Sequence, residues 1–128
     1  MPTSLKRCLL FTDIGFILYW SVTALAALKL VAIPPAWLFT DYNDPNIVAW
    51  NWSFMPLDLL ASVTGLIAVR QSAWQTMALI SATLTFCAGF LALSFWTFQA
   101  SFDPAWWTPN IILTLWPLIM LRHVITEP

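Results

Sequence analysis

The sequence predicts an all-α integral membrane protein built as a four-helix bundle, and three observations support this prediction. Hydrophobic residues make up 60% of the 128 residues and charged residues only 9%, whereas about 25% of a soluble domain is charged. Apolar runs of about 20 residues recur along the chain, which is the length that crosses a bilayer as a helix. Segments rich in Pro, Asp and Asn separate these runs. We therefore expect a single transmembrane domain over residues 1–128.

Four helices are expected, each bounded by turn residues or charges. Pro34 and Pro35 should end the first helix, and an Asp-Pro pair marks each of the two loops at that end of the bundle. Consecutive helices should pair as two antiparallel hairpins. The expected ranges are about 9–33, 49–69, 76–98 and 106–122.

Charged residues separate to opposite ends of this predicted bundle. The basic end carries Lys6, Arg7, Arg70 and Arg122, and the acidic end carries Asp41, Asp44 and Asp103. Since cytoplasmic loops carry an excess of Lys and Arg, both termini are predicted to be cytoplasmic. Lys29 is the exception near the outer boundary, and its long side chain can reach outward. Aromatic residues, Trp96 and Trp106 among them, are expected at this outer boundary as an interfacial belt.

Asp58 lies near the middle of the second predicted helix. A carboxylate there costs about 2.5–3.5 kcal/mol on insertion scales, and such residues usually face a bundle interior, a partner or a water-filled cavity. At about 100° per residue, Asn51 and Ser62 share the face of Asp58, and Leu60 lies opposite. Burial should keep Asp58 neutral and able to donate a hydrogen bond, unless Lys29 pairs with it.

Polar side chains on the other predicted helices would converge on this acid. Trp20 and Trp116 are predicted to lie deep, and a buried indole N–H needs a partner. This arrangement predicts a pocket for a lipophilic molecule with a polar head. Helix packing explains the Ser and Thr residues better, because membrane helices use them at their contacts, whereas Asp58 fits a functional and a structural role. The candidate pocket residues are Asp58, Asn51, Ser62, Asn110, Thr114, Trp20 and Trp116.

Asp13 is expected close to the inner surface, at a depth similar to that of two arginines. An acid near the interface is less costly than one at the bilayer centre. We therefore predict an ion pair at the inner interface among Asp13, Arg70 and Arg122 in preference to a role in a proton relay.

Several classes of site are not expected. Cys8 and Cys87 fall in different predicted layers, so a disulfide between them is not expected. With His123 as the one histidine and no CxxC motif, the chain lacks the ligands of a zinc or haem site, and we expect neither a metal nor a cofactor. A net charge of −1 gives no footprint for nucleic acid.

Two segments carry a family resemblance: FTDIGFILYW at residues 11–20 and DPNIVAWNWSFMPLDLLASVTGL at residues 44–66. They resemble the YvaD-like family of small four-helix bacterial membrane proteins. This resemblance implies four helices and a multi-pass location in the bacterial inner (cytoplasmic) membrane, and it implies no activity, because that family is uncharacterised. The residues that carry it are Asp13, Asn51, Trp52, Ser53, Pro56, Asp58 and Gly65.

A looser similarity is to the EXPERA group of sterol isomerases and sigma-2-type receptors. Those proteins bind lipophilic amines or sterols in a helical pocket with buried acids. This sequence lacks their set of His and Glu residues, so the similarity does not extend to isomerase chemistry.

Three functions remain open from the sequence. The favoured one is a non-catalytic protein in the lipid bilayer, either an accessory subunit of a larger membrane complex or a binder of a lipid, isoprenoid or pigment. The alternatives are an isomerase-like enzyme on a lipophilic substrate, with Asp58 as acid or base and Asn51 or Asn110 orienting the substrate, and a proton-coupled transporter of small molecules. The transporter would need a homo-oligomer, because four helices rarely enclose a full path.

Overall fold

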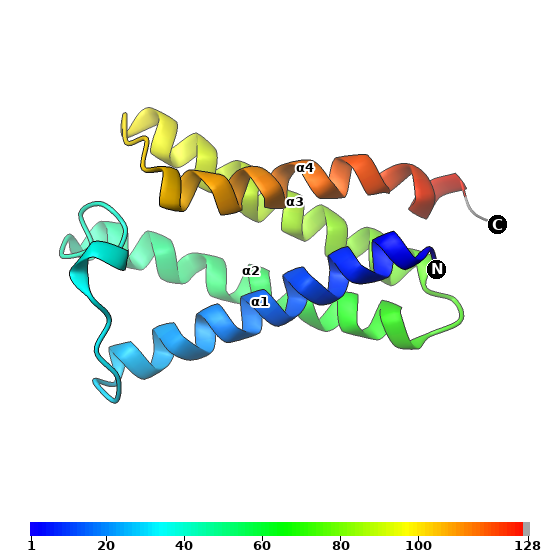
Figure 1. Cartoon of the computed structure of the whole chain (residues 1–128), viewed down its shortest axis with the longest axis horizontal. Coiled ribbons are helices and arrows are strands. Elements are labelled where there is room, and N and C mark those ends of the chain that lie inside the picture. The colour runs from blue at the N-terminus through cyan, green and yellow to red at the C-terminus, as the bar shows by residue number, and fades with distance from the viewer. Residues whose placement is uncertain (127–128) are drawn as a thin grey trace.

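Four long helices make up the chain in the computed structural model, which describes residues 1–126 (Figure 1). They are α1 Thr3–Ala27, α2 Pro45–Arg70, α3 Gln75–Phe98 and α4 Pro104–Thr126, with a short 3-10 helix, η1 Pro35–Trp37, between α1 and α2. Each of the four is long and apolar enough to cross a membrane. The prediction of an all-α chain with four such helices is confirmed.

Each helix packs against the next one along the chain. α1 packs on α2, α2 on α3 and α3 on α4, whereas α1 makes few contacts with α4. The beginning of α1, the turn between α2 and α3 and the last turns of α4 lie at one end, and the two longer loops lie at the other (Figure 1). Consecutive helices are therefore antiparallel, and α1 and α4 do not close against each other.

Both Asp-Pro pairs begin helices, although the sequence predicts them in loops. Asp44 Oδ1 accepts a hydrogen bond from Asn46 N at 2.8 Å, and Asp103 Oδ1 accepts one from Ala105 N at 2.9 Å. An aspartate cap followed by proline as the first helical residue is a favourable helix start, because the proline has no N–H to leave unbonded. α2 consequently begins at Pro45, before the predicted start near residue 49, and α4 begins at Pro104, before the predicted start near residue 106.

α1 lies nearer the N-terminus than the predicted range 9–33, and it ends at Ala27. Lys29 adopts a left-handed φ of 59°, and the next residue, Leu30, donates its N–H to Leu25 O at 2.9 Å. This closure across six residues is how a Schellman motif ends a helix. The position is usually occupied by glycine, so a lysine there gives no sequence signal that the helix stops.

Candidate functional site

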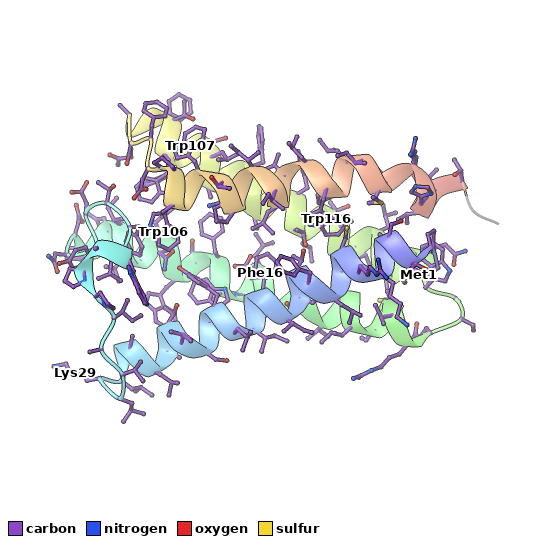
Figure 2. All side chains as sticks on the ribbon, in the orientation of Figure 1. Met1, Phe16, Lys29, Trp106, Trp107 and Trp116 are labelled. Atoms are coloured by element: carbon purple, nitrogen blue, oxygen red, sulfur yellow. The ribbon has the colours of Figure 1, made fainter. Side chains whose placement is uncertain are left out.

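Asp58 is held inside the protein by the indole of Trp20. Trp20 Nε1 donates a hydrogen bond to Asp58 Oδ2 at 2.8 Å, which joins α1 to α2, and the Asp58 side chain is only 5% exposed. The other carboxyl oxygen, Oδ1, has no hydrogen-bond partner within residues 1–126. Lys29 is exposed in the loop after α1 (Figure 2) and donates nothing to this carboxyl. One oxygen of the acid is thus fixed, and the other is buried without a hydrogen-bond partner in the described part of the chain.

A cavity of about 720 Å³ lies beside Asp58 and is lined by all four long helices. Its volume falls in the range of sites for small molecules, about 300–1,000 Å³. The largest shares of its wall come from α1 and α4, the two helices that make few contacts with each other. The cavity therefore exists because the first and last helices stay apart.

The structure brings most of the predicted pocket residues together. Those that line the cavity are Asp58, Asn51, Asn110, Trp20 and Trp116. Ser62 and Thr114 lie outside its lining, which corrects the prediction for these two residues. Ser62 Oγ bonds to the backbone oxygens of Asp13 and Asp58, at 3.1 and 3.0 Å, and so joins α1 to α2. Thr114 Oγ1 donates to Asn110 O at 2.7 Å within α4, so both hydroxyls are used in packing.

Two asparagines supply amide groups to the cavity wall. The Tyr19 hydroxyl donates to Asn51 Oδ1 at 3.3 Å, and Asn110 Nδ2 donates to Trp106 O at 2.7 Å. Neither bond uses the amide NH₂ of Asn51 or the amide oxygen of Asn110. The wall therefore keeps a donor and an acceptor that could orient the polar part of a ligand.

Aromatic side chains from α1 and α4 face each other across the cavity. Phe16 and Trp116 point into the space between these helices, and Trp106 and Trp107 lie on different sides of α4 (Figure 2). Of these, Phe16, Trp106 and Trp116 line the cavity. Trp116 Nε1 is buried and has no hydrogen-bond partner in the described part of the chain, so it is a second unsatisfied polar group, besides the Asp58 carboxyl, on a residue that lines the cavity.

Asp13 does not form the predicted ion pair with Arg70 and Arg122. The Asp13 side chain is 0% exposed, neither of its carboxyl oxygens has a hydrogen-bond partner among the described residues, and both arginines are exposed. Because α1 begins at Thr3, Asp13 lies about three turns into the helix instead of near its start. Its carboxyl lies against Gly65 in α2, where a Cβ would otherwise stand.

Sequence reasoning missed the aromatic residues of the cavity wall other than Trp20 and Trp116. Trp96 and Trp106, expected in an interfacial belt, line the cavity together with Phe39 from the loop before α2. The Phe39 ring lies 6.3 Å from Trp96 and 5.9 Å from Trp106 between centroids. A loop residue has no periodicity that could have revealed this contact. Along α1, a signal was present, because cavity-lining side chains recur with the helical spacing of three to four residues: Cys8, Thr12, Gly15 and Tyr19.

Fold and site together define a small all-α protein whose four helices are long and apolar enough to cross a membrane and line an apolar cavity beside a buried acid. The chain belongs to a family of unknown function, DUF5360, whose model matches residues 5–128. It is 45% identical over 128 residues to the uncharacterized protein YvaD of Bacillus subtilis (strain 168), covering 96% of this chain and 92% of that protein. The resemblance to the YvaD-like family is thus confirmed. No solved structure matches the chain significantly.

Proposed function

We propose that this protein binds a lipophilic molecule in the cavity beside Asp58, without catalysing a reaction. The observation that carries the proposal is the cavity itself, which has largely apolar and aromatic walls and, in its lining, one carboxyl whose second oxygen has no hydrogen-bond partner within residues 1–126. Sites for small lipophilic molecules usually combine apolar walls with a few polar groups that fix orientation. A lipid, an isoprenoid or a pigment with a polar head would match this pattern.

We further propose that the protein spans the cytoplasmic membrane of a bacterium. Large apolar side chains on the outer faces are more than half exposed, among them Leu60 at 52%, Val63 at 54% and Ile119 at 57%. Contiguous apolar surface of this kind is rare on soluble monomers and is favourable against lipid. The relative at 45% identity is bacterial, which supports the bacterial part of this proposal.

The proposed topology places both termini in the cytoplasm, and cysteine labelling tests it. After both native cysteines are replaced by serine, Asn43→Cys in the loop before α2 should react with a membrane-impermeant maleimide in intact cells stripped of their wall. Ser72→Cys in the turn between α2 and α3 should react only after lysis, because that turn lies at the end that carries Arg70. Both positions are exposed, so reaction in the reverse pattern would show the opposite topology.

Filling the cavity should displace its ligand. A Cβ at Gly15 meets nothing within 4 Å, and Gly15 lines the cavity, so Gly15→Phe places a ring in the cavity without a backbone clash. We expect lipophilic molecules that co-purify with the protein in mild detergent to fall at least roughly tenfold in this variant, which corresponds to about 1.4 kcal/mol of lost binding. Extraction followed by mass spectrometry measures the loss.

Leu18→Phe provides a matched control for this experiment. Leu18 is on the same helix, is 60% exposed and is absent from the cavity lining, so a phenylalanine there should face lipid and leave recovery unchanged. If Gly15→Phe and Leu18→Phe retain the same lipophile at the wild-type ratio, the molecule sits elsewhere and the proposed function is wrong.

A further inference from the structure

The cavity has one acidic group and one basic group within the described chain, and they lie at different ends. Asp58 is the acid, close to Trp20, and Arg7 is the base. Trp20 and Arg7 are about 20 Å apart along α1 at 1.5 Å per residue. Arg7 is exposed, so its guanidinium can remain in water, whereas Asp58 is buried. The ionisable group that a deeply bound molecule would meet is therefore Asp58.

The Asp58 carboxyl is only half used by the protein. Trp20 occupies Oδ2, and Oδ1 is buried without a partner in residues 1–126. A buried carboxylate is costly unless it is paired. A ligand that carries a positive charge would pair it, whereas a purely apolar ligand would leave it uncompensated.

Aromatic rings surround the part of the cavity toward the longer loops. Trp50 and Trp96 lie 5.3 Å apart between centroids at 82°, and Tyr19 and Trp106 lie 6.3 Å apart at 78°. All four residues line the cavity. Such rings attract organic cations through their electron-rich faces, and aromatic cages are a common way to bind an ammonium group.

We infer that the ligand is a lipophilic monocation, an organic ammonium or phosphonium compound, with the Asp58 carboxylate as its counter-ion and the aromatic rings around its apolar substituents. This inference rests on the proposed function, because it names the ligand class of the same cavity. If Asp58 is neutral before binding, its proton passes to water as the cation enters. The cavity then gains one positive and one negative charge, and the complex stays neutral.

Three probes of similar size and different charge test the inference: tetraphenylphosphonium, the isosteric anion tetraphenylborate, and neutral triphenylmethanol. Binding is measured by equilibrium dialysis of the full-length protein in phosphatidylcholine nanodiscs, with empty nanodiscs subtracted. We expect saturable binding of tetraphenylphosphonium at one per protein, at least tenfold tighter than that of triphenylmethanol. Asp58→Asn should weaken binding of the cation by roughly 10- to 100-fold, and Asp58→Glu should retain most of it.

Binding of triphenylmethanol by Asp58→Asn at the wild-type level shows that the cavity is intact in this variant. If Asp58→Asn loses triphenylmethanol as well, the inference is tested by comparing how tightly the wild-type protein binds the three probes. Equal binding of the cation and the neutral probe, or preference for the anion, overturns the cationic ligand. Gly15→Phe separates this result from failure of the proposed function. If the wild-type protein binds triphenylmethanol and Gly15→Phe does not, the cavity is still a site for lipophilic molecules. If the wild-type protein binds none of the three probes saturably, both the cationic ligand and the proposed function are overturned.

Discussion

Gly65→Ala should lower the free energy of unfolding by about 1–3 kcal/mol, the range for an added methyl group in a tightly packed core. A Cβ at this position would overlap the Asp13 carboxyl, with Cγ at 2.7 Å, and would lie 2.8 Å from Ser81 Oγ. Both side chains are 0% exposed, so neither can swing into solvent to make room. Chemical or thermal unfolding of the purified protein, followed by tryptophan fluorescence, measures the effect.

Gly15→Ala is the matched control for this substitution. Its Cβ meets nothing within 4 Å, and alanine favours a helix over glycine by about 1 kcal/mol. We therefore expect Gly15→Ala to keep or raise the stability that Gly65→Ala lowers. If the two variants are equally stable, the contact of Asp13 with the α2 backbone does not constrain the protein.

The clash at Gly65 also has a specific remedy, because the groups in its way are side chains. Asp13→Ala removes the carboxyl that the new Cβ would overlap. The double variant Asp13→Ala with Gly65→Ala should accordingly be more stable than the sum of the two single changes predicts. A coupling of this kind, measured in a double-mutant cycle, would identify steric overlap as the cause and would argue against a general weakening of α2.

The orientation of Asp58 could be predicted from the sequence, because a carboxyl in an apolar helix has few favourable environments. The same reasoning did not succeed for Asp13. The expected depth of Asp13 depended on the predicted range of the first helix, 9–33, whereas α1 runs from Thr3 to Ala27. The sequence did not reveal the earlier end of α1, because the Schellman motif at Lys29 has no glycine to mark it. A shift of one helix along its axis thus turned a predicted surface ion pair into a buried contact with Gly65.

The cavity itself was only partly predictable. Helical projection indicates which residues share a face, and it correctly grouped Asn51 with Asp58. It does not indicate how closely two helices approach, because that distance depends on contacts between residues remote in sequence. The separation of α1 from α4 follows from how each packs on its neighbour in the chain, and the ring of Phe39 reaches the cavity from a loop.

Gly89→Ala should have the second large effect, on stability and on the cavity together. A Cβ there would lie 2.7 Å from Thr114 Oγ1, 2.8 Å from Asn110 O and 2.9 Å from Leu113 Cβ. Because Asn110 O belongs to the backbone, α4 as a whole must move away from α3. α3 provides most of the contacts of α4, so we expect a loss of about 1–3 kcal/mol in the free energy of unfolding.

This displacement should also reduce ligand binding, since Asn110 and Leu113 line the cavity. Thr114→Ala added to Gly89→Ala should restore only part of the stability, because it removes one obstructing side chain and leaves the carbonyl of Asn110 in place. If Thr114→Ala rescues Gly89→Ala only in part while Asp13→Ala rescues Gly65→Ala more fully, the contact at Gly89 is between two backbones and the contact at Gly65 is between a side chain and a backbone. Full rescue by Thr114→Ala would instead show that α4 can accommodate the methyl group, and that the close approach of α3 and α4 does not hold the cavity wall in position.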